Sequence, residues 1–160
     1  MTSPSPTSRQ LNPEYRARLF EAVNSAPFLR HLALKMTELG WGSARFEMEA
    51  APFRLQPFGV VHGGNFAMLI DSATFWACFL TLDSEDDGLT SVDLKVNYLA
   101  PSRLGPLGCD GKLIKAGKTL SYAEAEVRDA EGRLLAHGTS TLMRLPQRGL
   151  AIGVPMWMPS

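Results

Sequence analysis

The sequence is poor in cysteine and has no excess of charge of either sign. Its two cysteines, Cys78 and Cys109, are too few for a disulfide framework or a thiolate zinc site, and they favour a cytoplasmic location. Sixteen Lys and Arg residues balance sixteen Asp and Glu residues, so the formal net charge is zero. Binding to nucleic acid or to an acidic membrane surface needs a basic surplus. We therefore expect neither as a partner.

Several motifs of known chemistry are also missing. The chain has no GxGxxG or GxxxxGKS/T phosphate loop and no GxSxG nucleophile elbow. Its three histidines are scattered without the spacing of metal ligands. The longest apolar run, residues 66–82, contains Asp71, and a charge there opposes insertion into lipid. We expect a buried helix at this run, no membrane span and no metal.

The length of 160 residues suits a single domain. Residues 1–11 are rich in Ser, Thr and Pro and lack the apolar segment of a secretory signal, so they are predicted to form a disordered tail. The predicted domain spans residues 12–146. Residues 147–160 form a C-terminal extension that either covers an apolar patch or shapes a ligand pocket.

The hydropathy pattern predicts an α+β fold. Asn12 and Pro13 are typical of a helix start, and alternation over residues 31–39 and 44–50 predicts a hairpin around Gly40–Trp41–Gly42. A loop over 51–61 leads into the long apolar helix. Four strands are then predicted, near residues 91–98, 107–116, 123–128 and 134–145. Because the helix is hydrophobic on every side, we expect six antiparallel strands to curl around it and a partner subunit to cover the rest.

Two glycines, Gly63 and Gly64, stand directly before the long helix and after His62. They allow a ligand to approach the unpaired N–H groups of the first helical turn, which carry partial positive charge and suit a developing oxyanion. A tight turn that serves only packing is the alternative.

Asp71 is the only ionisable residue between His62 and Asp83. A buried carboxylate costs several kcal/mol unless it is paired or used in chemistry. It is either a general base or nucleophile, or a carboxylate bonded to a hydroxyl or a backbone amide elsewhere.

The spacing of Gly64 and Asp71 predicts a dimer if both act on one substrate. The two residues are seven positions apart, which is about 10 Å along a helix. One small carbonyl cannot contact both within about 3 Å. An antiparallel pairing of two copies of this helix brings the glycine of one copy to the aspartate of the other.

The motifs together resemble the hotdog-fold thioesterases, most closely the PaaI-like and THEM-type acyl-CoA thioesterases. The resemblance covers residues 30–145 and rests on Gly59–Gly64, Asp71, Ser91–Leu94, Tyr98–Pro101, Gly117–Thr119 and Asp129–Gly132.

The resemblance implies hydrolysis of an acyl-CoA thioester without a cofactor, because coenzyme A is part of the substrate. It gives Asp71 the role of base or nucleophile, Gly63 that of oxyanion donor, and Ser91 that of orienting the attacking water. Gln56 and His62 match residues near the reacting group. The resemblance also implies a homodimer, with a dimer of dimers as the common assembly of the family. Asn65 departs from the small or apolar residue of many relatives.

Other residues have less specific interpretations. Lys95, Lys118 and two further basic residues, Arg103 and Lys115, are candidates for contacts with the phosphates of coenzyme A, or else solvated surface charges. Gly64 and Asn65 are further candidates for substrate binding. Cys78 and the aromatic residues 75, 76 and 79 are interpreted mainly as core residues. The three aromatic residues also suit the lining of an acyl tunnel. His31 and His137 are predicted to be structural residues of strands.

Two other functions stay open from the sequence. An enoyl-thioester hydratase or dehydratase of the same fold would use His62 with Asp71. A non-catalytic acyl-CoA-binding protein would keep the pocket and lack turnover.

Overall fold

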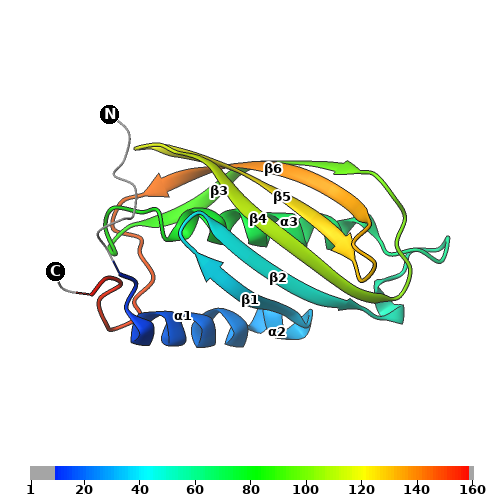
Figure 1. The fold of residues 1–160 in the computed structure, drawn as a ribbon, viewed down its shortest axis with the longest axis horizontal. Coiled ribbons are helices and arrows are strands. Elements are labelled where there is room, and N and C mark those ends of the chain that lie inside the picture. Colours follow the sequence, from blue (N-terminus) through cyan, green and yellow to red (C-terminus); the bar gives the residue numbers. More distant parts are fainter. Residues whose placement is uncertain (1–9, 159–160) are drawn as a thin grey trace.

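A six-stranded antiparallel sheet packs against one long helix in the computed structural model, which describes residues 10–158 (Figure 1). The strand order is β1-β2-β4-β5-β6-β3, so β1 and β3 are the two edges. The elements are α1 (Pro13–Ser25), α2 (Pro27–His31), β1 (Leu34–Gly40), β2 (Ser43–Ala50), η1 (Pro52–Arg54), α3 (Gly63–Phe79), β3 (Gly88–Tyr98), β4 (Gly105–Ala116), β5 (Leu120–Asp129) and β6 (Leu134–Leu145). The predicted α+β class is confirmed.

The first helix begins where its capping residues predict. The side chain of Asn12 accepts a hydrogen bond of 2.9 Å from the backbone N–H of Glu14, and Pro13 occupies the first helical position. The prediction was wrong about His31, which ends the short helix α2 and does not belong to a strand. Pro27 starts this extra helical turn, because proline is compatible with the first position of a helix.

The long helix sits unusually close to the sheet at two glycines. A Cβ atom added to Gly111 on β4 would lie 2.3 Å from the backbone oxygen of Ala73 on α3. A Cβ on Gly138 of β6 would lie 2.8 Å from the side chain of Ile70. These positions admit only glycine at the observed spacing, so they determine how deeply α3 sinks into the curved sheet.

One chain alone does not enclose α3, and the sequence predicted that its sheet leaves part of the helix for a partner subunit. The sheet covers the side of Leu69, Ile70 and Ala73, all of which have no exposed surface. The opposite side is only partly buried. It carries an open stripe that consists of Ala67, Met68, Asp71, Ser72, Phe75 and Trp76. This spacing of three and four residues defines one face of a helix.

The edge strand β3 borders this open stripe and is itself poorly covered. Leu94 and Tyr98 pair with Ser140 and Ala136 of β6, which are buried on the side of α3. Directly paired residues share a face of the sheet, so Leu94 and Tyr98 also lie on that side. They are nevertheless 38% and 58% exposed. The open stripe and this edge therefore form one continuous uncovered region.

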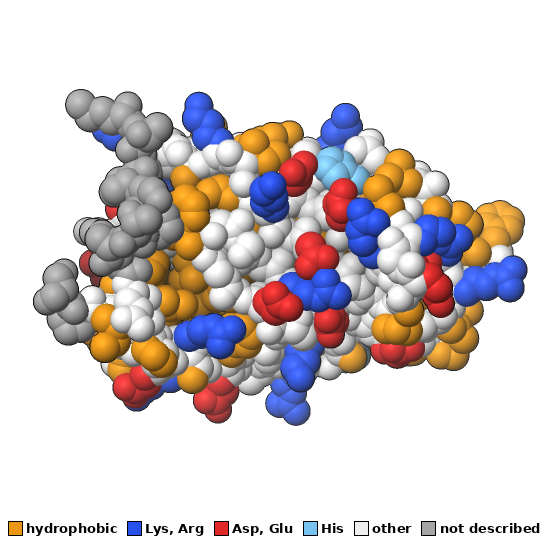
Figure 2. All heavy atoms as spheres, in the orientation of Figure 1, with side chains coloured by type: hydrophobic (Ala, Val, Ile, Leu, Met, Phe, Trp, Pro, Cys, Tyr) orange, Lys and Arg blue, Asp and Glu red, His pale blue; other side chains and the backbone are white. Residues whose placement is uncertain are grey.

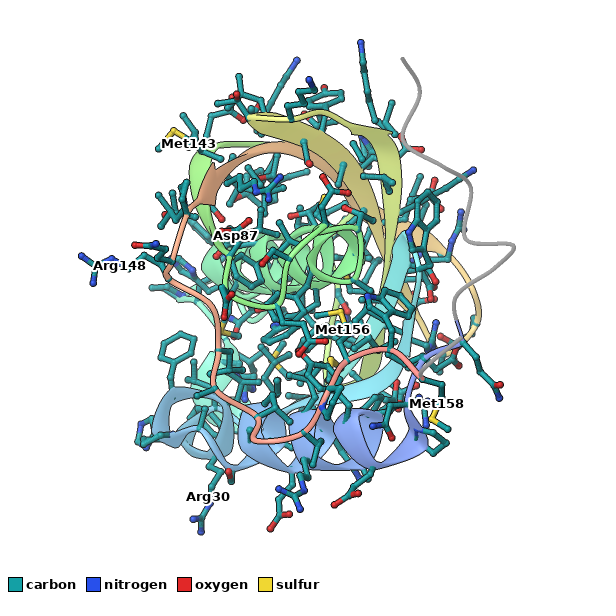
Figure 3. All side chains as sticks on the ribbon, turned by 90° about the vertical axis from the view of Figure 1, so that its left-hand side faces the viewer. Arg30, Asp87, Met143, Arg148, Met156 and Met158 are labelled. Atoms are coloured by element: carbon teal, nitrogen blue, oxygen red, sulfur yellow. The ribbon has the colours of Figure 1, made fainter. Side chains whose placement is uncertain are left out.

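The C-terminal extension closes one end of the sheet-and-helix core. Figure 3, which views the molecule from that end, shows the sheet arching around α3 and the extension crossing between α3 and α1 with Met156 in the interior. Met156 is 1% exposed, and its backbone oxygen accepts a hydrogen bond from the N–H of Asn12. Leu11 and Trp157 pair in a β-bridge. The extension thus covers apolar surface next to α1. Residues 1–9 of the predicted tail lie outside the described residues.

The outer face of the sheet carries basic and acidic side chains mixed together (Figure 2). Arg45 on β2, for example, binds Asp110 on β4 at 2.7 Å and Glu47 at 3.0 Å. Within residues 10–158, no helix is both long and apolar enough to cross a membrane. Cys78 belongs to the core as predicted, and burial raises the pKa of its thiol to about 12.

Candidate active site

The start of α3 has one backbone donor without a partner. The Nδ1 atom of His62 accepts a hydrogen bond of 2.9 Å from the N–H of Gly64, and the backbone oxygen of His62 accepts one of 3.0 Å from the N–H of Asn65. His62 is therefore the N-cap of the helix. Among the described residues, no acceptor binds the N–H of Gly63. This amide is free to bind an oxyanion, in the position that the sequence predicted.

An apolar cavity of about 280 Å³ lies on one side of the free amide. Its lining includes Gly63, Phe66 and Tyr98. The ring of Tyr98 lies so close to Gly63 that a Cβ on the glycine would be 2.8 Å from a ring carbon. The absence of a side chain at Gly63 therefore lets the tyrosine pack directly over the helix start.

A second cavity, of about 350 Å³, lies on the other side of the helix start. It is lined by Gly64, Asn65 and Met68 of α3 and by Arg54 of the preceding loop. Arg54 and Asn65 connect the loop to the helix: Nη1 of Arg54 donates to Oδ1 of Asn65 at 3.0 Å. The backbone oxygen of Arg54 also accepts a hydrogen bond of 2.9 Å from the N–H of His62. This bracing holds the glycine pair in place.

The carboxylate of Asp71 is bound by a hydroxyl from the neighbouring strand. Oγ of Ser91 donates a hydrogen bond of 2.8 Å to Oδ1 of Asp71. The register of β3 shifts between Ser91 and Asp93, which is a β-bulge that directs Ser91 toward α3 before the regular alternation resumes. Oδ2 has no hydrogen-bond partner among residues 10–158. The carboxylate is partly buried on the open stripe, and not in an apolar interior as expected.

Asp71 does not line either cavity of its own chain. It follows the glycine pair by about two helical turns, which separates the two groups by about 10 Å. The structure therefore brings Asp71 together with Ser91, and brings Gly63, Gly64 and His62 together, as two groups on one helix.

Other predicted site residues lie farther from these two groups. The side chain of Gln56 turns back onto its own loop, where Oε1 accepts a hydrogen bond of 2.8 Å from the N–H of Phe58. Lys95 lies on the face of β3 that points away from α3, because its neighbour Val96 pairs with Gly138 on the helix side. Lys118 lies in the β4–β5 turn, at the end of the sheet opposite the start of α3 (Figure 1). Contacts of these residues with substrate stay predictions.

Two residues at the site were missed from the sequence. Tyr98 was part of a strand pattern and of a motif of the resemblance but was given no role at the site, and Arg54 was passed over as part of a loop. The one available signal for Arg54 is an arginine enclosed by apolar neighbours, Phe53 and Leu55, in a proline-containing loop. No group of three or more potential metal ligands is found within the described part of the chain.

The fold and the glycine-led helix define a hotdog-fold protein, and comparison with known proteins identifies the family. The thioesterase superfamily model matches residues 58–136. A Caenorhabditis elegans protein provisionally named an esterase is 31% identical over 152 residues, covering 92% of this chain and 88% of that one. Human acyl-coenzyme A thioesterase 13 is 30% identical over 102 residues, covering 62% of this chain and 71% of that one. This chain belongs to the thioesterase superfamily.

Solved structures of similar fold support the same family assignment. A Haemophilus influenzae thioesterase superimposes with a TM-score of 0.74 at 25% identity, covering 81% of this chain and 89% of that one. A Mycobacterium tuberculosis structure provisionally described as that of an esterase has a TM-score of 0.72 at 29% identity, covering 76% of this chain and 98% of that one. The predicted hotdog fold is confirmed, and the protein is a thioester hydrolase by family.

Proposed function

We propose that the protein hydrolyses acyl-CoA thioesters, with Asp71 as general base or nucleophile and the backbone amide of Gly63 as the oxyanion donor. The observation that carries the proposal is the free Oδ2 of an Asp71 carboxylate oriented by Ser91, on the same helix whose first turn offers an unpaired N–H. The similarity to human and mouse acyl-coenzyme A thioesterase 13 supports coenzyme A as the leaving group.

In the general-base route, water forms a bond to the thioester carbon while Oδ2 of Asp71 takes its proton. The carbonyl oxygen gains negative charge, which the N–H of Gly63 and the positive end of α3 stabilise. The tetrahedral intermediate then collapses, the carbon–sulfur bond breaks, and coenzyme A leaves as a thiolate that takes up a proton. In the nucleophile route a carboxylate oxygen of Asp71 forms a bond to the thioester carbon, the carbon–sulfur bond breaks, and coenzyme A leaves as a thiolate. Water then hydrolyses the resulting anhydride to the free acid and the Asp71 carboxylate.

The geometry also supports a homodimer as the active unit. A carbonyl at Gly63 is too far from Asp71 of the same helix, so the partner subunit's Asp71 completes each site. The uncovered region formed by the open stripe of α3 and the edge strand β3 suits this pairing. An edge strand of eleven residues leaves a row of unpaired backbone groups that a second β3 can satisfy. A dimer of dimers and a cytoplasmic location stay predictions from the sequence.

Replacement of Asp71 by Asn tests the proposal. The variant keeps the size of the side chain and removes the proton acceptor, so we expect thiol release from a panel of acyl-CoA substrates to fall at least about 100-fold. Asp86→Asn is the matched control, because Asp86 is an exposed carboxylate in the loop after α3. Unchanged turnover in a folded Asp71→Asn protein would exclude this mechanism.

The same panel separates the other two functions. Hydration of crotonyl-CoA without release of free thiol would identify a hydratase. Tight binding of acyl-CoA without thiol release at any chain length would identify a binding protein. In the structure His62 accepts the Gly64 N–H through Nδ1, a contact that fits a capping role better than proton transfer from that nitrogen.

A further inference from the structure

Arg54 is a buried cation without an anionic partner. The residue is 3% exposed, and it makes no ion pair with any of the residues 10–158. Nε donates to the backbone oxygen of Glu49 at 3.1 Å, and Nη1 donates to Oδ1 of Asn65 at 3.0 Å. Nη2 is buried and has no hydrogen-bond partner in the described part of the chain. Both N–H groups of Nη2 are therefore unused.

An unpaired buried charge is costly, and it marks a position where an acceptor is needed. Burial lowers the pKa of the Arg54 guanidinium below its ordinary value, because the charged form has lost water and has gained no counter-charge. The hydrogen bonds of Nε and Nη1 hold the loop against the helix start, but Nη2 takes no part in this structural role. The ring of Phe53 covers the guanidinium at 4.8 Å and is itself 71% exposed, so a movement of this one side chain uncovers the arginine.

The second cavity brings Arg54 next to the glycine pair at the start of α3. Arg54 lines this cavity together with Gly64, one residue from the free amide of Gly63. Met68 lines it from the next turn of α3, on the open stripe that also carries Asp71. Most of the remaining lining is apolar. The cavity therefore offers an apolar wall for the methylene groups of an acyl chain, together with the cation of Arg54.

We propose that the second cavity holds the acyl group of a substrate whose far end carries a carboxylate, and that Nη2 of Arg54 binds this carboxylate. The inference rests on the proposed function. The phosphates of coenzyme A lie at the far end of the pantetheine arm from the thioester, so they do not suit a cation in a cavity at the start of α3. A neutral amide carbonyl of pantetheine would satisfy the hydrogen bond but not the charge. A carboxylate satisfies both.

Matched substrates test this selectivity. We compare succinyl-, glutaryl- and adipyl-CoA with uncharged isosteres in which an isopropyl group replaces the carboxylate. We expect the native protein to have the higher kcat/KM for at least one carboxylated member. In Arg54→Gln this preference should fall at least about tenfold, as expected for loss of a hydrogen bond between charged groups. Arg16→Gln, which removes an exposed arginine of α1, should leave the preference unchanged.

Arg54→Lys keeps the positive charge and provides a second variant if Arg54→Gln does not fold. It should retain part of the preference. Binding of the thioether analogues of the same substrates, which cannot be hydrolysed, gives a readout that does not need turnover. Failure of the proposed function would abolish hydrolysis but leave the preference in binding.

Three results would overturn the inference. The first is a native protein that prefers the uncharged isosteres in both assays. The second is an equal loss for charged and uncharged substrates in Arg54→Gln, which would assign Arg54 to pantetheine or to bracing alone. The third is a variant that changes only the association of the subunits, which would assign Nη2 to a backbone oxygen of a second copy.

Discussion

Ser91 on β3 donates a hydrogen bond of 2.8 Å to the carboxylate of Asp71 on α3, two residues separated by 20 positions in the chain. The bulge between Ser91 and Asp93 sets this contact, because it changes which residues of β3 face the helix. The hydrogen bond occupies one carboxylate oxygen and leaves the other available. Ser91 is thus a positioning residue for Asp71.

Replacement of Ser91 by Ala should lower kcat by about tenfold, which is the scale of a hydrogen bond to a charged group. KM should stay nearly constant, because the variant loses the orientation of the carboxylate and not a contact with substrate. Steady-state kinetics measures both. Ser91→Thr keeps the hydroxyl on a β-branched side chain and should recover activity, whereas Ser43→Ala on β2 should have no effect. A change in KM with an unchanged kcat would contradict this role.

Replacement of Gly63 by Ala should leave the fold intact and lower kcat/KM by about tenfold, because the added Cβ displaces the ring of Tyr98 by contact at 2.8 Å. The backbone of Gly63 has a negative φ, so alanine fits its conformation. Tyr98 is exposed enough to move, which keeps the loss of stability small. The double variant Gly63→Ala with Tyr98→Ala should bind substrate better than Gly63→Ala. The prediction is wrong if the double variant shows no recovery.

Replacement of His62 by Ala should lower the free energy of unfolding by about 1 kcal/mol, because the N–H of Gly64 loses its acceptor. Asparagine is a good N-cap residue, so His62→Asn should restore most of this stability. Urea unfolding measures the difference. Activity separates the two roles: a capping residue recovers activity in His62→Asn, whereas a histidine needed for proton transfer does not.

Replacement of Leu94 by Asp should weaken the proposed dimer by at least about 100-fold, since an unpaired carboxylate would be buried at the β3 edge. Activity should fall in parallel, because each site needs the partner subunit's Asp71. Analytical ultracentrifugation and thiol release, at the same protein concentrations, measure the two quantities. Leu150→Asp changes a similarly exposed leucine in the C-terminal extension and should alter neither. A monomeric variant with full activity would refute the shared site.

Local patterns predicted most of the secondary structure. The start of α1 at Asn12–Pro13, the β1–β2 hairpin and the full span of β6 were all predicted correctly, because caps, turns and alternation act over a few residues. The short helix α2 was missed because Pro27 can both end one helix and begin another. The sequence predicted that the sheet leaves part of α3 uncovered but not which face stays open, because hydrophobicity does not distinguish burial in one's own chain from burial against a partner.

The candidate site was predicted in part. The glycine pair was identified from its place directly before the long helix, and Asp71 was identified as the only ionisable residue of the apolar run. The resemblance to hotdog-fold thioesterases implied the roles of Gly63 and Asp71. Arg54 and Tyr98 were not identified. Their importance depends on which loop folds against the helix start and on what each side chain fails to contact there, and a single sequence carries no record of these long-range contacts.

The sequence by itself therefore determined the kinds of element, their order and the chemical groups at the start and middle of the long helix. Only the tertiary structure decided that β3 lies at the edge beside Asp71, that its bulge turns Ser91 inward, and that Arg54 is buried without a counter-charge. The reason is physical. Helix and strand signals are local, whereas strand order, register and the pairing of buried charges result from the packing of the whole chain.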